Sequence, residues 1–250
     1  MKKINHQLIT VPLEFKVACR IYMISVQEVL QIFINHATVF DSTSRIYSQG
    51  YTEAVTTITH YILAKDRNAA PSKAFAQCKD TATSCLSMIV GLGRKKTGQA
   101  LTKRRQCRTP VTLLFETMKR VYAPKDKLYL DEHSVLELTK DFCVLCEIHN
   151  CYPKEYLEYF MNKISLADAH SRKALKIEQP DSCYALYFLI ADGFERDIST
   201  IATLTDLEMD FYDRMQEIRL EIYPIRDLGQ RTALLRAFYL DYYYQLIQRP

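Results

Sequence analysis

The stretch FKVACRIYMISVQEVLQIFINHATVFDSTSR, residues 15–45, decides the fold, because a related stretch occurs again in the same chain. When Phe15 is placed on Phe142, it aligns without a gap with FCVLCEIHNCYPKEYLEYFMNKISLADAHSR, residues 142–172. Eleven positions are identical, and they include polar residues such as Asp41, which recurs as Asp168. Because apolar periodicity alone does not produce matches of that kind, we expect an internal duplication of one structural unit.

Start signals for a helix fall at the same aligned position in both copies. In the first copy, Ser25 followed by Glu28 forms a capping box, in which the two side chains bind each other's backbone amide. In the second copy, Pro153 occupies the place of a first helical residue and Glu155 keeps the third place. Apolar residues with helical spacing follow both signals, so each copy is predicted to be a helix, a tight turn and a second helix.

The rest of the chain also favours helices, since only 14 of the 250 residues are Gly or Pro. Only His6–Val11 alternates as a short strand would. We expect an all-α protein in which two related helix-turn-helix-containing units, 1–91 and 109–194, are joined by a basic linker or loop at 92–108 and followed by a Tyr-rich C-terminal helical pair at 195–250. Further helices are predicted at 50–65, 72–90, 110–122, 131–149, 181–191, 196–222 and 227–248.

Positive charge is concentrated in one segment. The formal net charge is only +4, from 33 basic and 29 acidic residues. No acidic residue lies between Asp80 and Glu116, yet seven basic residues fall within fifteen positions there. These are Arg94, Lys95, Lys96, Lys103, Arg104, Arg105 and Arg108. The excess is therefore local, as in segments that are flexible or contact nucleic acid.

The first copy resembles known DNA-binding units. Residues Ala18 to Leu30 have a small residue, a turn and then Ile24-Ser25, a pattern similar to the helix-turn-helix. With Gln7–Pro12 in front, residues 7–40 also resemble ribbon-helix-helix repressors, which implies a dimer that reads DNA with an N-terminal strand. The chain departs from both patterns, because Met23 replaces the usual turn glycine and the second helix offers Gln27, Glu28, Gln31 and Asn35 without a cation.

The basic segment is the stronger candidate for nucleic-acid binding, because clustered Lys and Arg bind phosphates whatever the base sequence. It has no interleaved aromatic residues, so base stacking is not expected. A phosphate loop is excluded, since Gln99 stands where its lysine would be needed. The seven basic residues are thus predicted to contact DNA rather than RNA, and a solvated linker with incidental charge is the alternative.

No catalytic, cofactor or metal motif stands out. The run Cys143 to Cys151 contains zinc-ligand residue types, but the first copy keeps only Cys19 in the place of Cys146. We therefore interpret the eight cysteines as small buried residues in a reducing compartment. The N-terminus lacks a signal-peptide core, and the longest apolar runs are about eight residues, too short to span a membrane. We expect a cytoplasmic protein that is not an enzyme and does not bind membranes.

Two classes of function remain. The first is a non-catalytic accessory or regulatory protein that binds nucleic acid through the basic segment. The second is a helical scaffold or adaptor for protein–protein interaction without nucleic-acid binding. Aromatic residues of the C-terminal helices, which combine apolar area with polar tips, would then pack on the two units or contact a protein partner or a second copy.

Overall fold

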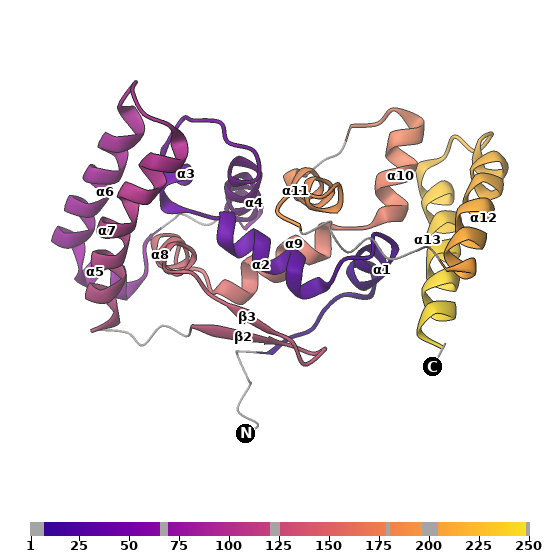
Figure 1. Ribbon diagram of the computed structural model, residues 1–250, viewed down its shortest axis with the longest axis horizontal. Coiled ribbons are helices and arrows are strands. Elements are labelled where there is room, and N and C mark those ends of the chain that lie inside the picture. The colour runs from indigo at the N-terminus through magenta and orange to yellow at the C-terminus, as the bar shows by residue number, and fades with distance from the viewer. Residues whose placement is uncertain (1–7, 66–69, 121–125, 179–180, 197–204, 249–250) are drawn as a thin grey trace. The chain divides into compact units, whose positions relative to one another are not determined.

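The computed structural model describes residues 8–65, 70–120, 126–178, 181–196 and 205–248 (Figure 1). Within these residues there are thirteen helices and three short strands. The predicted all-α class is confirmed, with the strands forming one small sheet.

The chain forms two compact units, and each unit is built from two separate segments. The first contains residues 1–11 and 27–161, and the second contains residues 12–26 and 162–250. These boundaries differ from the division that the repeat suggested, because the short segment 12–26 belongs with the C-terminal part of the chain.

The helices of the two related stretches lie at corresponding positions of the alignment. They are α1 (Leu13–Ile21), α2 (Val26–His36), α3 (Val39–Thr43), α4 (Tyr51–Ala64), α8 (Lys140–Ile148), α9 (Pro153–Lys163), α10 (Leu166–Leu175) and α11 (Ser182–Ala191). In the alignment that places Phe15 on Phe142, the first residues of α1, α2 and α3 fall on those of α8, α9 and α10, and the last residue of α4 falls on that of α11. The two start signals are confirmed, since α2 begins directly after Ser25 and α9 begins at Pro153.

The turn after the first helix of each stretch has the same backbone conformation. Met23 and Asn150, which are aligned with each other, both have a φ of 51°. In both turns the next residue donates its N–H to the carbonyl five residues back, at 3.0 and 2.9 Å. This is the helix ending that normally uses glycine, and here Met23 and Asn150 adopt the left-handed conformation in its place.

Between the two stretches the first unit contains one short and two long helices. The short helix is α5 (Lys73–Gln77), and the long helices α6 (Lys79–Arg94) and α7 (Ala100–Lys119) lie side by side (Figure 1). Only residues 95–99 separate them, so the loop expected over 92–108 is much shorter. Pro110, which was expected to mark a helix start, lies inside α7. The buried Cys107, Leu114 and Met118 have helical spacing on both sides of it, and this packing continues the helix through the proline.

A three-stranded sheet occupies part of the region where a helix was predicted at 131–149. Its strands are β1 (Leu8–Ile9), β2 (Lys127–Leu130) and β3 (Val135–Glu137), with β1 parallel and β3 antiparallel to the central β2. Leu128, Leu130 and Leu136 face the core, and His133 in the turn has a φ of 65°. Strands of three or four residues are no longer in sequence than about one turn of helix, so alternation over them does not distinguish a strand from a helix.

Aromatic rings at equivalent positions meet in the core of the first unit. Phe33 of α2 stacks on Phe160 of α9 with ring centroids 5.0 Å apart, and these two residues are aligned with each other in the repeat. Phe142 of α8 meets Phe33 edge to face at 6.0 Å. Such pairs contribute beyond their buried area, so the second helices of the two stretches form the centre of this unit.

The second unit is made of α1, α10, α11, α12 (Asp206–Ile222) and α13 (Leu228–Ile247). The helix α13 packs against α10, α1 and α12 (Figure 1). Phe211 of α12 stacks on Tyr242 of α13 with centroids 3.9 Å apart, so much of the aromatic content of the tail is used inside the unit. The first part of the helix predicted at 196–222 falls outside the described residues.

Among the described helices, none by itself combines the length and apolar character needed to cross a membrane. Only α1 and α2 counted together, as one bent pair, reach that length and composition.

Candidate nucleic-acid interface

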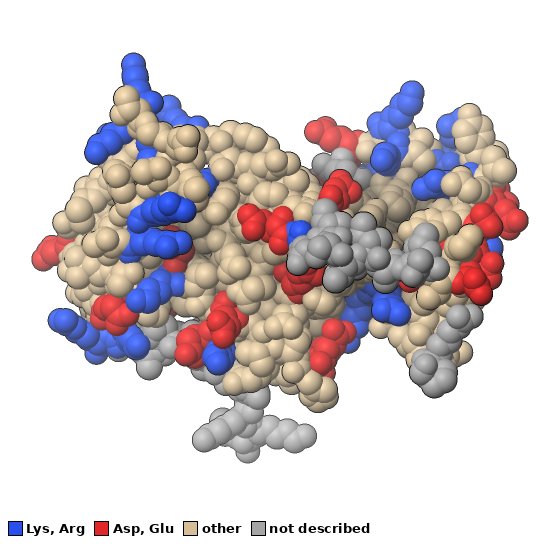
Figure 2. All heavy atoms as spheres, viewed as in Figure 1, with Lys and Arg blue, Asp and Glu red and all other residues tan. Residues whose placement is uncertain are grey.

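The predicted basic residues lie at the turn between α6 and α7 and along the first half of α7. Arg94 is the last residue of α6, and residues 95–99 form the turn, in which Gly98 has a φ of 94°. The helices α6 and α7 with the turn between them form a helical hairpin, whose tip is this turn. Figure 2 shows Lys and Arg side chains gathered at the tip of the hairpin and along it. We call the five exposed residues of the set the hairpin cations: they are Arg94, Lys95, Lys96, Arg105 and Arg108.

The hairpin cations lie at the turn between α6 and α7 and on the first half of α7. Arg105 and Arg108 are three residues apart on α7 and therefore share a face of the helix. The segment itself contributes no acidic side chain, since the nearest acidic residues in sequence are Asp80 and Glu116. Five of the seven predicted residues are thus placed where a phosphate can reach them.

Lys103 has a different environment from the one predicted. Its side chain is buried, with 4% of the residue exposed, and Nζ donates a hydrogen bond to the backbone carbonyl of Lys95 at 2.5 Å. The ammonium group therefore closes the turn between α6 and α7. Lys103 supports the shape of the hairpin rather than offering its charge to an external phosphate.

Arg104 is also directed inward. Nε and one terminal nitrogen of its guanidinium donate hydrogen bonds to the two carboxylate oxygens of Asp41, both at 2.7 Å. The guanidinium lies 3.5 Å from the ring centroid of Tyr51, and only 1% of the Asp41 side chain is exposed. A bidentate pair stacked on a ring is strong and geometrically specific, so Arg104 anchors α7 to α3.

A second carboxylate lies beneath the hairpin. Asp141, near the start of α8, accepts a hydrogen bond from the backbone N–H of Val39 at 3.0 Å and so caps α3. Burial raises the pKa of Asp141 to about 6; the neighbouring Asp41 adds to this rise, while the Val39 hydrogen bond and Arg108 oppose it. Arg108 is therefore exposed and also close enough to influence the partly buried carboxyl of Asp141.

One further cation lies beside the tip and was not predicted. A Cβ on Gly93 would lie 3.3 Å from Cβ of Ser44, so the segment after α3 runs against the end of α6. Arg45 follows Ser44 directly and is exposed. Arg45 is the last residue of the first related stretch, and its place near the hairpin depends on tertiary packing.

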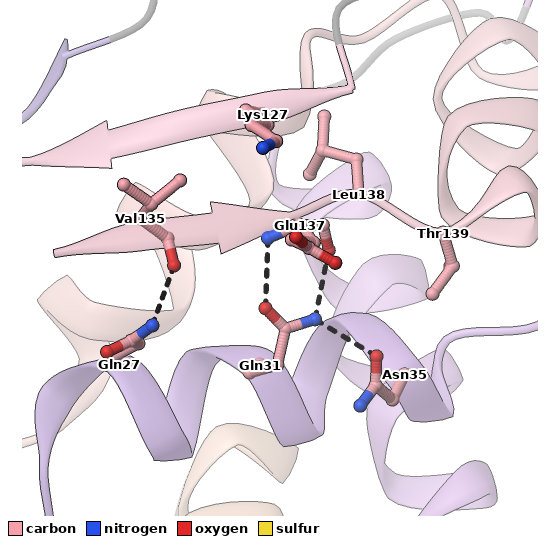
Figure 3. Close-up of a pocket in the computed structure, with 8 residues that line it drawn as sticks. All are labelled: Gln27, Gln31, Asn35, Lys127, Val135, Glu137, Leu138 and Thr139. Carbon is pink, nitrogen blue, oxygen red and sulfur yellow. Dashed lines mark hydrogen bonds between the residues drawn. The ribbon is translucent and has the colours of Figure 1, made fainter.

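The helix that resembled a DNA-recognition helix uses its polar side chains inside the unit (Figure 3). Gln27 Nε2 donates to the carbonyl of Val135 at 2.8 Å. Gln31 accepts from the N–H of Glu137 at 3.0 Å and donates to its carbonyl at 2.9 Å, and it also donates to Asn35. These side chains bind the backbone along the outer edge of β3. They line a cavity of about 600 Å³ between α2 and the sheet. Because their amides are already bound to β3, we do not assign base reading to α2.

The opposite edge of the sheet is completed in a related way. Lys154 of α9 donates from Nζ to the carbonyl of Leu8 in β1 at 2.7 Å, and it pairs with Glu158 at 3.4 Å. In the alignment of the repeat, Lys154 corresponds to Gln27, and Val135 corresponds to Leu8. Gln27 thus binds β3, which precedes the second stretch, and its counterpart Lys154 binds β1, which precedes the first stretch.

The cysteines are buried, and burial lowers the reactivity of their thiols. Burial raises the pKa of the Cys143 thiol to about 12 and that of Cys146 well above its ordinary value. Such thiols stay protonated at neutral pH and are poor nucleophiles. Among the described residues, no three His, Cys, Asp or Glu side chains are grouped so that they could hold a metal ion.

No family model, curated protein or solved structure matches this chain. A function has to be inferred from the residues and their geometry.

Proposed function

We propose that this protein is a non-catalytic nucleic-acid-binding accessory or regulatory protein and that the hairpin cations contact the phosphates. The single observation that carries the proposal is the exposure of five cations on one hairpin whose sequence contains no acidic side chain between Asp80 and Glu116. Phosphate contact without base reading is the expected mode, because α2 has its amides bound to β3.

The dimensions of the hairpin support this proposal. From Gln99 to Arg108 the helix rises about 14 Å at 1.5 Å per residue. Over that length one strand of duplex DNA carries about four phosphates. The five hairpin cations therefore suit a short stretch of phosphate backbone, and Lys103 and Arg104 hold the hairpin in shape beneath them.

The test is fluorescence anisotropy of a labelled random-sequence duplex over a salt series. The wild type is compared with a variant in which the five hairpin cations are Gln. A control variant carries Gln at five other exposed basic positions of the first unit, Lys65, Lys73, Lys79, Lys119 and Arg120. Both variants lose the same total charge, so only the location of the charge differs.

We expect the wild type and the control to bind with a steep dependence on salt. The hairpin variant should lose roughly four units of the log–log slope, at about 0.9 per phosphate contact. Equal binding by both variants would contradict the proposal, and so would absence of binding by the wild type at low salt. A matching series with single-stranded RNA decides between DNA and RNA.

A protein contact through the C-terminal helices is the second candidate function. Met209, Tyr212 and Leu220 of α12 and Tyr223, which directly follows it, are large apolar residues that remain exposed, and their spacing places them on one helix face. Exposed charges of both signs border this face, with Asp213 and Glu217 on one side and Arg219 on the other. Sedimentation velocity of the wild type tests self-association directly: a dimer assigns the face to a second copy, and a monomer assigns it to a different protein.

A further inference from the structure

A cavity of about 530 Å³ lies within the second unit, between the C-terminal ends of α10 and α12 and the first half of α13. Its size falls in the range of sites for small molecules. Four of its lining residues are cations: Lys173 of α10, Arg219 of α12, Arg231 of α13 and Arg226 of the connection between α12 and α13. Among the described residues that line it there is no Asp or Glu, so positive charge dominates the cavity.

Arg231 is buried, and in the described part of the chain it has no carboxylate partner. Only 3% of the residue is exposed, and one guanidinium nitrogen donates to the carbonyls of Ile222 and Tyr223 at 2.7 and 3.4 Å. Its Nε is buried and finds no hydrogen-bond partner among the described residues. A buried cation whose donors are incompletely used is costly, and an anion in the cavity would offset that cost.

The neighbouring polar groups supply no negative charge. His170 Nδ1 and the hydroxyl of Tyr239 are 2.5 Å apart. Burial, together with Arg219 and Lys173, lowers the pKa of His170 to about 4, so its ring is neutral at physiological pH. In the part of the chain that the structure describes, no ion pair joins Lys173, Arg219 or Arg226 to a carboxylate.

The remaining wall is apolar. Met215, Ile222 and Leu235 line the same cavity and are buried. A ligand that fits both walls has an anionic group and an apolar body. We propose that this cavity binds a small phosphate monoester with an aromatic or aliphatic body, its phosphate facing the cations and its body packing on the apolar wall. Two negative charges on the phosphate suit the four cations better than the single charge of a carboxylate does.

Lys173 and Arg219 also lie near helix C-termini, where cations are favourable without any ligand. The test therefore has to measure binding itself. Phenyl phosphate is the probe, titrated by calorimetry, with phenol, inorganic phosphate and benzoate as comparison compounds. The double variant K173Q/R219Q leaves the buried Arg231 in place, and R214Q is the control, since Arg214 is exposed on the same helix but does not line the cavity.

We expect saturable binding of phenyl phosphate by the wild type and by R214Q, and roughly tenfold or greater weakening in K173Q/R219Q. Phenol and inorganic phosphate should each bind more weakly than phenyl phosphate. The phosphate should also raise the pKa of His170, measured by NMR, because a nearby anion favours the imidazolium. Phenol should leave that pKa unchanged.

The proposal is overturned by absence of saturable binding, by equal weakening in R214Q, or by unchanged binding in K173Q/R219Q. Benzoate binding as tight as phenyl phosphate would overturn the assignment to phosphate, and inorganic phosphate binding as tight would overturn the role of the apolar wall. The variant with five Gln on the hairpin should keep its affinity for phenyl phosphate, so this inference and the nucleic-acid proposal fail independently.

Discussion

Two adjacent arginines of the hairpin have different roles. Arg104 and Arg105 are adjacent in the sequence, yet the first pairs with the buried Asp41 and the second is exposed. A buried carboxylate that loses its partner keeps its desolvation cost, whereas an exposed cation that is removed costs little. Loss of Arg104 should therefore mainly lower stability, whereas loss of Arg105 should mainly weaken nucleic-acid binding.

The variant Arg104→Met should lower the free energy of unfolding by about 3–5 kcal/mol, because it leaves the carboxylate of Asp41 buried without its cationic partner. The matched variant Arg105→Met should change it by less than about 0.5 kcal/mol. Urea unfolding followed by circular dichroism measures both. Similar losses in the two variants would show that the Asp41 pair does not anchor the hairpin.

Asp141 should make stability depend on pH between about 4 and 6. Its pKa rises from 3.8 in the unfolded chain to about 6 in the folded state, so the folded state binds more protons in this window. The contribution of Asp141 to the unfolding free energy is therefore greatest at low pH and is lost as the pH rises to 6, by at most roughly 1.4 kcal/mol per pH unit.

The variant Asp141→Asn removes that titration, while its amide oxygen can still accept from Val39. Relative to the wild type, it should become more stable as the pH rises from 4 to 7. Asp213→Asn, which changes an exposed carboxyl, is the control and should leave the wild-type profile unchanged. A D141N profile parallel to the wild type in urea unfolding at each pH would rule out the expected titration.

At the scale of elements, the two related stretches use one turn with different side chains. Met23 and Asn150 both adopt a φ of 51°, although the left-handed conformation is costly for residues with a Cβ. Met23 is 46% exposed, so little packing would be lost by removing its side chain.

The variant Met23→Gly should therefore raise the free energy of unfolding by about 0.5–1 kcal/mol, since glycine adopts this conformation without a steric cost. Met88→Gly is the matched control, because Met88 is 48% exposed but lies inside α6. That change should lower stability by about 1 kcal/mol. A loss of stability in both variants, measured by thermal unfolding, would contradict the argument from the turn.

For the whole molecule, the important feature is that each unit takes segments from distant parts of the chain. The helix α1 comes early in the sequence but belongs to the second unit. There Phe15 meets Tyr187 edge to face at 6.0 Å, and Glu14 accepts hydrogen bonds from Arg236 at 2.6 Å and from Ser165 at 2.8 Å. The C-terminal part of the chain therefore lacks one wall of its core without α1.

A fragment of residues 162–250 should accordingly unfold without a cooperative transition. A fragment with residues 12–26 joined to it by a flexible linker should recover cooperative unfolding and a well-dispersed NMR spectrum. Cooperative unfolding of the shorter fragment would contradict this description of the second unit. Circular dichroism during heating is the measurement for both.

Local signals predicted much of the fold. The start of α2 after Ser25 and of α9 at Pro153 follows from capping chemistry, which acts within one turn of helix. The strands around Leu128 and Leu136 were missed because so short an alternation is also compatible with a helix. The cluster of positive charge at residues 94–108 is visible in the sequence, but the inward direction of Lys103 and Arg104 depends on how the helices pack.

The sequence by itself determined the helical class, the starts of α2 and α9 and the spacing of the two related stretches, because periodicity and capping are local properties of the chain. Only the tertiary structure decided which cations are free. Asp41 reaches Arg104 across 63 positions, and Lys173, Arg219 and Arg231 gather from three helices around one cavity. Whether a charge faces a carboxylate, a carbonyl or solvent is settled when helices pack, since burial and long-range pairing do not exist before the chain has folded.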